Sequence, residues 1–297
     1  MARSELSAPR RPIERGAARV AGAAESQPGF WRRLKQQPPA LVGAALSAML
    51  VLVALFAGAI APYDPFAMTS EVLQPPSARH LFGTDDLGRD IFSGVVHGAR
   101  TSLLVGFAAA GTATVIGLLV GSLAGYAGGL IDDLLMRVSE LFQIIPRFFL
   151  ALIIVALLGS NIWLIVLLLG VTYWPGTARL VRAQLLSLRT RDYVTAARAI
   201  GVPDGQILIR HLLPAALPPV ITLAALQVGG AILVEAGLSF LGLGDRSVVS
   251  WGMLLNDAQQ FVRRAWWMSV FPGAAITLTV LGLNLLADGL NEALSPR

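Results

Sequence analysis

Residues 40–61 read ALVGAALSAMLVLVALFAGAIA and carry no charged side chain. As an α-helix, this run rises about 33 Å at 1.5 Å per residue, which is enough to cross the hydrocarbon core of a bilayer. A cleavable secretory signal is the alternative, because the alanines at its end resemble a cleavage site. Such signals have an apolar core of about 7–15 residues, whereas this run is longer and follows a long polar leader. We therefore expect an uncleaved first membrane span.

The composition of the whole chain also indicates a membrane protein. Hydrophobic residues make up 55% of the 297 residues and charged residues only 14%, and the mean hydropathy is +0.67. Soluble domains carry about 25% charged residues, because a water-facing surface needs them. The chain has no cysteine, which excludes disulfides, thiolate catalysis, iron–sulfur clusters and zinc–thiolate sites.

Five further apolar runs follow, at about 102–127, 138–158, 161–178, 215–241 and 269–287. The sequence thus predicts an all-α fold, a bundle of six membrane spans. An even number of spans places both termini on one side of the membrane. The many arginines of the N-terminal segment put that side in the cytoplasm by the positive-inside rule.

The positive charge of the chain is concentrated beside these runs. The net charge of +5 and the basic isoelectric point could suggest a nucleic-acid partner. The distribution of the basic residues along the chain instead favours contact with membrane lipid, and we expect no nucleic-acid partner. Eight basic residues lie in the N-terminal segment: Arg3, Arg10, Arg11, Arg15, Arg19, Arg32, Arg33 and Lys35. Six more lie in the predicted internal loop 179–214: Arg179, Arg182, Arg189, Arg191, Arg198 and Arg210. The predicted external segment 63–101 is acidic overall, which agrees with the orientation, whereas the external segment 242–268 agrees less well.

Residues 1–39 are polar and rich in arginine, so we expect a cytoplasmic N-terminal tail. Within it, Phe30–Lys35 could lie on the membrane surface, with Phe30 and Trp31 as interfacial anchors. The alternative is that its basic residues only mark the cytoplasmic end of the first span. Farther along, Gly117, Gly121 and Gly125 recur every four residues, which predicts a close helix contact within the bundle or at a subunit interface.

The most informative segment is 191–219, RDYVTAARAIGVPDGQILIRHLLPAALPP, on the predicted cytoplasmic side. Its first part predicts a short helix with one apolar stripe, formed by Tyr193, Ala196, Ala197 and Ile200. Gly201 suits a left-handed C-terminal cap. A second stripe is formed by Ile207, Leu208, His211 and Leu212, and Pro214 is expected to end that helix at Leu213. Two short amphipathic helices would thus meet at a glycine and dock either on the ends of neighbouring spans and the membrane surface or on a partner.

This segment resembles the EAA loop of bacterial ABC-importer permeases, whose pattern is E-A-A-x3-G-x9-I-x-L-P. Ala196 and Ala197 fill the two alanines, Gly201 follows at the required distance, and Leu213-Pro214 closes the pattern. Thr195 replaces the acidic residue, for which Asp192, one turn earlier, is a candidate substitute. His211 stands in place of the isoleucine, and the ending is typical of the peptide-transporter branch.

Two other segments resemble the same branch, the dipeptide/oligopeptide/nickel permeases. One is FGTDDLGRD at 82–90, followed by GARTSL at 98–103; the other is EAGLSFLGLG at 235–244, followed by Trp251-Gly252. The resemblance covers about residues 40–295. It implies a transmembrane permease domain at 40–297, with the coupling loop at about 190–214. The long tail and short first external loop resemble the C-type subunit.

The resemblance implies a division of labour. A P-loop ATPase needs G-x4-G-K-[ST], and the only lysine, Lys35, has no such glycines beside it. No cofactor is expected in this chain; ATP and Mg²⁺ would bind to partner ATPases. The implied partners are a homologous B-type permease, two ATP-binding-cassette ATPase subunits and an external solute-binding protein, in the inner membrane. The coupling residues would be Asp192, Tyr193, Thr195, Ala196, Ala197, Gly201, Asp204, His211, Leu213 and Pro214.

Charged residues in or beside the predicted spans are candidates for the translocation path, because charge inside a membrane usually faces a wet cavity or a partner. Glu235 is one candidate for the path or its outer gate. Glu140 and Arg147 could share a helix face as an ion pair, or both could be interfacial. Asp85, Asp86, Arg89 and Asp90 form either an external docking surface or gate, or a solvated turn that caps a helix.

Two functions from other classes are weaker readings. A rhomboid-like intramembrane protease is suggested by Gly237-Leu238-Ser239-Phe240, but such chemistry needs a histidine base inside the membrane. His80, His97 and His211 all fall in predicted loops, and they do not suggest a metal site. An ion-coupled secondary transporter would not explain the EAA-type loop. The solute could be a dipeptide, an oligopeptide, a nickel chelate or glutathione.

Overall fold

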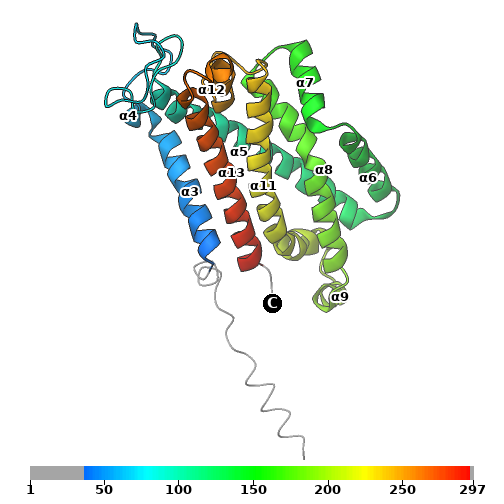
Figure 1. Ribbon diagram of the computed structural model, residues 1–297. Helices are drawn as coiled ribbons and strands as arrows, with labels where there is room; N and C mark the ends of the chain where they lie inside the picture. The colour runs from blue at the N-terminus through cyan, green and yellow to red at the C-terminus, as the bar shows by residue number, and fades with distance from the viewer. Residues whose placement is uncertain (1–36, 295–297) are drawn as a thin grey trace, which may run out of the picture.

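The computed structural model describes residues 37–294, so residues 1–36 of the predicted tail, with the segment Phe30–Lys35, lie outside the described residues. The described residues form a bundle of helices (Figure 1). Four long apolar helices are α3 (Pro38–Leu55), α5 (Ile91–Ala127), α8 (Ile162–Leu188) and α13 (Trp267–Leu294); a fifth spans Asp204–Phe240. A bent pair gives the sixth candidate span, and the predicted all-α class is confirmed.

The bent pair consists of α6 (Gly129–Ile144) and α7 (Arg147–Leu158), whose axes differ by 76°. The expectation of one continuous helix over 138–158 is therefore wrong. Pro146 lacks an N–H group and forces the preceding residue out of the helical region, so Ile145 is extended at φ −89° and ψ 126°. The break also separates Glu140 from Arg147, and the predicted pair on one helix face does not form.

Several helices extend beyond the apolar runs that predicted them. α5 begins at Ile91 instead of about 102, because Asp90 caps its first turn by accepting a hydrogen bond from the Ser93 N–H at 2.7 Å. α8 continues to Leu188 instead of about 178. A hydropathy pattern detects only the part of a helix that lies in hydrocarbon, so the polar ends are missed.

α5 and α8 are packed through the predicted glycine face. A Cβ added to Gly117 would lie 2.4 Å from Cβ of Thr177, and one added to Gly121 would lie 2.4 Å from the carbonyl oxygen of Ala178. Only glycine permits so close an approach of the two helices. The predicted close contact is confirmed within this chain, between its own helices.

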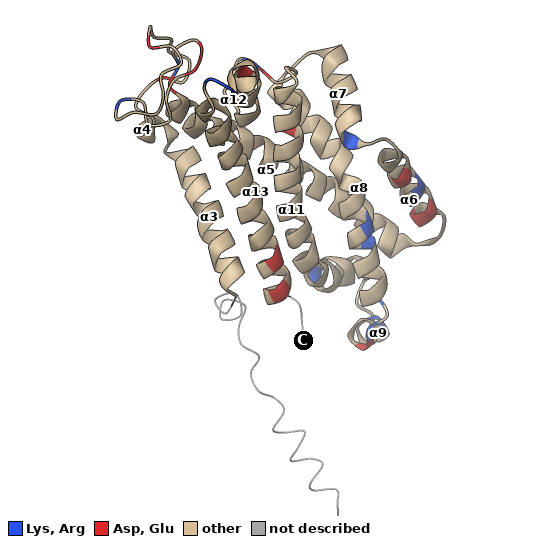
Figure 2. Ribbon diagram, viewed as in Figure 1, with Lys and Arg blue, Asp and Glu red and all other residues tan. Residues whose placement is uncertain are grey.

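The two ends of the bundle differ in structure. At one end lie α4 (Ala57–Ile60), the irregular segment 61–90, α12 (Trp251–Ala258) and the short 3-10 turn Gln259–Phe261. At the other end lie the start of α3, the end of α13 and α9 (Asp192–Ala199) (Figure 1). The middle of the long helices is almost free of charged residues, which gather towards the two ends (Figure 2).

Candidate functional site

The predicted glycine turn is present in the 191–214 loop. α9 ends at Ala199, and Gly201 has φ +81°, a left-handed conformation that favours glycine. Its N–H donates to the carbonyl of Arg198 at 3.0 Å, and the N–H of Val202 donates to the carbonyl of Ala197 at 3.1 Å. These bonds satisfy carbonyls at the end of α9, as a C-terminal cap does.

The second helix of the loop does not end where predicted. α10 (Asp204–Ile207), a π-helical turn η1 (Leu208–Leu212) and α11 (Leu213–Phe240) form one continuous helix, and Leu213 itself is helical at φ −60° and ψ −49°. The expectation that Pro214 stops the helix is wrong. The wider π-helical turn immediately before Pro214 gives room for its ring and for the carbonyl that its missing N–H leaves unpaired.

The buried face of the loop is not the one predicted for α9. Val194 is fully buried with Ile207 and Leu212 against the ends of α8 and α11, as a single apolar cluster. Three residues of the predicted stripe are instead exposed, Tyr193 at 44%, Ile200 at 82% and Ala196, whereas the fourth, Ala197, packs against this cluster. In the second helix, Ile207 and Leu212 are buried as predicted, whereas His211 is exposed. The loop therefore docks on its own bundle and still presents an apolar surface at the end of the molecule.

Polar contacts give the loop residues different surroundings. Arg198 and Asp204 form an ion pair at 3.4 Å across the glycine turn, so Asp204 is engaged within the loop. Asp192, the candidate substitute for the missing acidic residue, is exposed, as is Thr195. Asp192 and Tyr193 line a hollow of about 740 Å³ together with Arg210, His211 and Pro214.

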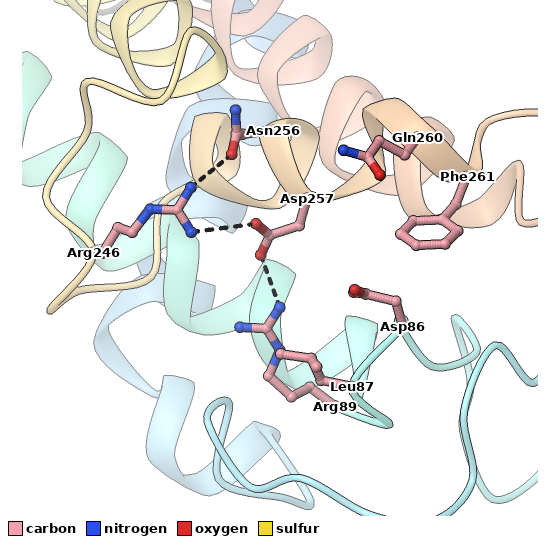
Figure 3. A pocket seen from close by; sticks show the side chains of 8 residues that line it. All are labelled: Asp86, Leu87, Arg89, Arg246, Asn256, Asp257, Gln260 and Phe261. Carbon is pink, nitrogen blue, oxygen red and sulfur yellow. Dashed lines mark hydrogen bonds and ion pairs between the residues drawn. The ribbon is translucent and has the colours of Figure 1, made fainter.

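The predicted external residues Asp85 and Arg89 connect two distant segments. Asp85 accepts hydrogen bonds from the N–H groups of Leu87 at 2.9 Å and Arg89 at 2.8 Å, and from the Arg89 side chain. The guanidinium of Arg89 also binds Asp257 on α12 at 2.8 Å, and Arg246 lies 3.8 Å from the same carboxylate (Figure 3).

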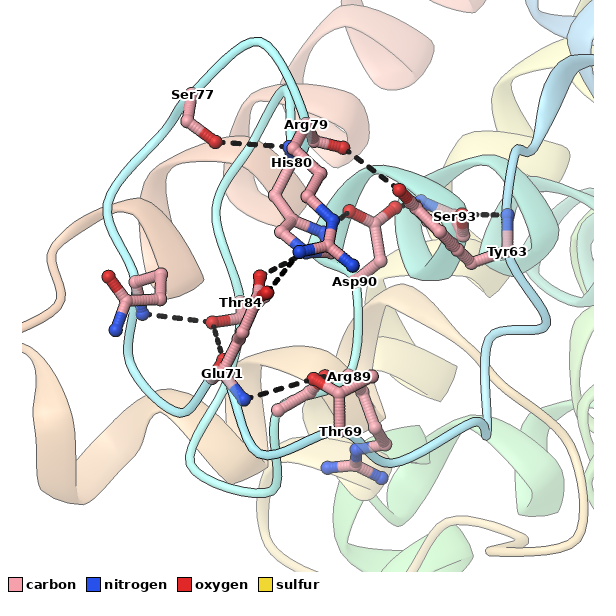
Figure 4. Close-up of polar contacts among 12 residues, drawn as sticks. Tyr63, Thr69, Glu71, Ser77, Arg79, His80, Thr84, Arg89, Asp90 and Ser93 are labelled. Atoms are coloured by element: carbon pink, nitrogen blue, oxygen red, sulfur yellow. Dashed lines mark hydrogen bonds and ion pairs between the residues drawn. The ribbon is translucent and has the colours of Figure 1, made fainter.

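Asp90 has a different role from its neighbours. Its carboxylate caps α5 and lies 2.9 Å from Nδ1 of His80, whose Nε2 lies 3.1 Å from Glu71 (Figure 4). His80 is only 4% exposed. The helix-capping reading is confirmed for Asp90, and the cluster holds the irregular segment 61–90 in place.

Asp86 faces a pocket at the α12 end of the bundle. The pocket has a volume of about 330 Å³ and is lined also by Arg89, Arg246, Asp257 and Phe261 (Figure 3). Burial raises the pKa of Asp86, and the neighbouring Asp85 carboxylate adds to the effect. Sequence reasoning missed Asp257 as the partner of Arg89, because ion pairs between residues so far apart in the chain leave no local pattern.

Glu235 lies in α11, beside α12. The side chain is 1% exposed, and Oε1 accepts a hydrogen bond from the Ser239 hydroxyl at 2.7 Å, whereas Oε2 has no partner among the described residues. The Ser239 hydroxyl, considered above as a nucleophile, thus donates to a carboxylate. Two of the three histidines are in helices and not in loops: His97 in the first turns of α5 and His211 in η1.

Sequence comparison identifies the family. Residues 117–297 match the family described as the binding-protein-dependent transport system inner membrane component. The chain belongs to this family. Residues 29–76 also match the N-terminal transmembrane domain of oligopeptide transport permease C, which agrees with the predicted C-type subunit.

Curated relatives are similar over most of their length. The dipeptide transport system permease protein of Alkalihalophilus pseudofirmus is 42% identical over 90% of this chain and 88% of its own. The di/tripeptide transport system permease protein of Pseudomonas aeruginosa is 39% identical over 90% and 91%. A glutathione transport system permease protein of Escherichia coli is 41% identical over 90% and 89%. The chain is thus a transmembrane permease subunit of an ATP-binding-cassette importer, in the inner membrane.

Proposed function

We propose that the permease forms half of a translocation path for dipeptides or similarly short peptides. The support is the similarity to permeases named for dipeptides and di/tripeptides over nearly the whole chain. Glutathione is the second candidate, since a permease named for it is almost equally similar. Glutathione is itself a short peptide, so both candidates belong to one chemical class.

We further propose that an ATPase subunit docks on the 191–214 loop and that this chain binds neither ATP nor Mg²⁺. The observation that carries this proposal is the apolar face of α9, with Ile200 82% exposed beside the Gly201 turn. An exposed apolar surface at the end of a bundle is typical of a protein interaction site. The pair of Arg198 and Asp204 fixes the turn, and Asp192 is available for a polar contact at its edge.

The remaining partners follow from the proposed role. A homologous B-type permease would supply the other half of the path, and a second ATPase would dock on it. An external solute-binding protein would deliver the peptide at the end that carries α12. The start of α3, the end of α13 and the 191–214 loop lie at one end of the bundle (Figure 1), which supports two cytoplasmic termini. The 40–297 permease domain and the separate 1–39 tail remain predictions.

The test is uptake by the complete importer, reconstituted with its binding protein and ATPases. We expect ATP-dependent uptake of a labelled dipeptide. Ile200→Asp should abolish uptake and co-purification of the ATPase, because it places a charge in the proposed contact without disturbing the buried face. Ile200→Leu, the matched control, should retain both. Transport by the permease subunits without ATPase would refute ATP coupling, and uptake of glutathione but not of dipeptides would select the second candidate.

A further inference from the structure

Arg147 lies at the break between α6 and α7, near mid-depth of the broken span. α7 starts at Arg147 and ends at Leu158, where the chain turns into α8. The start of α8 is fixed at the α12 end of the bundle, since the N–H of Ile162 donates to Asp245 at 3.0 Å. The 12 residues of α7 rise about 18 Å at 1.5 Å per residue. This is somewhat more than half of a hydrocarbon core of about 30 Å.

The guanidinium of Arg147 contacts an aromatic ring and not an acid. Its central carbon lies 4.3 Å from the centroid of the Tyr173 ring, and no carboxylate of the described residues lies within ion-pair distance. Tyr173 is 7% exposed and packs against Gly230 of α11, where a Cβ would lie 3.0 Å from the phenol oxygen. The ring is therefore a fixed platform for the guanidinium.

The contact with the ring leaves the guanidinium able to bind an anion. The group has five N–H donors in a planar fork that fits a carboxylate, and contact with one ring cannot engage all of them. The Arg147 side chain is only partly buried. α6 and α7 lie on the side of α8 away from α3 and α13 (Figure 1), so the break is at an open flank of the bundle.

An unpaired positive charge at this depth is not expected to face lipid. Charged residues in spans almost always face a bundle interior or a water-filled cavity, and they mark ion and substrate pathways. At mid-depth, an arginine side chain is too short to reach the headgroups on either side. The charge thus faces either a water-filled cavity, in which an anionic solute can bind, or a carboxylate from another subunit.

We propose that Arg147, held by Tyr173, binds a carboxylate of the transported solute at the middle of the membrane. The proposal rests on the proposed function, because a short peptide carries a C-terminal carboxylate. Its site is distinct from the 191–214 loop and from the external cluster. Arg147 would therefore contribute to selectivity for anionic groups after the binding protein has released the solute.

The absence of cysteine in this chain permits a test by chemical restoration of charge. In the complete importer, Arg147→Cys should lower kcat/KM for dipeptide uptake at least tenfold, equivalent to about 1.4 kcal/mol. Aminoethyl methanethiosulfonate forms a disulfide with the cysteine, releases methanesulfinate and adds a cation. This reagent should restore most of the uptake, whereas the neutral ethyl reagent of similar size should not. The dipeptide should also slow the modification. The unsubstituted importer treated with each reagent is the control.

Assembly measurements separate the possible outcomes. Arg147→Gln should retain co-purification with the partner permease and the ATPases while lowering uptake. Loss of co-purification would assign the arginine to a carboxylate of the partner permease and overturn the proposal. Normal uptake by Arg147→Gln, or equal restoration by both reagents, would also overturn it. Absence of dipeptide uptake by the unsubstituted importer would instead refute the proposed function.

Discussion

Replacing Gly121 by alanine is expected to separate α5 from α8. The added Cβ would lie 2.4 Å from the carbonyl oxygen of Ala178, 2.8 Å from Cβ of Val181 and 3.0 Å from Cα of Ala178. Two of these three atoms belong to the backbone of α8, so a side-chain rotation cannot relieve the clash. The helices must move apart by about 1 Å to restore an ordinary contact distance.

The magnitude follows from a comparison of two substitutions in the same helix. Overpacking of a well-packed contact costs about 1–3 kcal/mol, and alanine gains about 0.5–1 kcal/mol over glycine in a helix interior. Gly111 is the matched control, because it is also in α5 and a Cβ there would meet no atom within 4 Å. Both variants share the helix-propensity gain, so their difference isolates the overpacking cost. We expect Gly121→Ala to be about 1–3 kcal/mol less stable than Gly111→Ala.

The assay is equilibrium unfolding of the purified permease in mixed micelles with increasing denaturing detergent. Gly121→Ala should shift the midpoint to lower detergent concentration, and Gly111→Ala should leave it unchanged or raise it slightly. Equal midpoints for the two variants would refute the reasoning, since they would mean that the glycine face does not set the distance between α5 and α8.

Four further predictions concern other parts of the chain. Gly201→Val should lower uptake and its coupling to ATP hydrolysis, because a β-branched residue at φ +81° is strained by at least about 1–2 kcal/mol, whereas Gly205→Val, also in open space, should retain both. Asp86→Asn should raise the melting temperature at pH 7, because a carboxyl with a raised pKa favours folding only when protonated; this gain should vanish as the pH falls below the ordinary value of 3.8. Asp245→Asn should lower the melting temperature at pH 7. Burial alone would raise the pKa of Asp245, but hydrogen bonds from Ser247 and Ile162 outweigh burial and lower it. The Asp245 carboxylate therefore stabilises the fold at pH 7, and this stabilisation is lost in acid. If Glu235 lines the translocation path, Glu235→Gln should lower uptake several-fold without a change in melting temperature. Normal uptake by this variant would exclude a role of Glu235 in the path.

The membrane spans could be predicted because their cause is local. Runs such as 40–61 are apolar all round, and hydropathy alone identifies them. The break at Pro146 also had a local cause, since a proline excludes its predecessor from the helical region. Hydropathy does not reveal this break, because residues 138–158 are apolar enough on average to be identified as one span and hydropathy does not register backbone geometry.

The contacts that shape the two candidate sites are not local, and the sequence could not supply them. Periodicity identified an apolar stripe on α9, yet the side that is buried depends on where α8 and α11 end. Val194 fits that space, and Tyr193 and Ile200 are left outside. Similarly, Arg89 could be recognised as a charged external residue, but its pairing with Asp257 depends on the placement of α12 beside α5.

The arrangement of the helices indicates where the permease is expected to bend when a partner moves the 191–214 loop. The helix from Asp204 to Phe240 is continuous and reaches the α12 end of the bundle, where Arg89, two residues before the start of α5, binds Asp257 of α12. α5 is in turn packed closely on α8 through Gly121, so we expect these helices to move as one unit. α6 is connected to α8 by a hydrogen bond of 2.7 Å between Arg182 and Asp132, and the chain between α6 and α7 is extended at Ile145. We therefore expect the chain to bend most easily at the break at Pro146. Displacement of the 191–214 loop should change the angle between α6 and α7, directly beside Arg147.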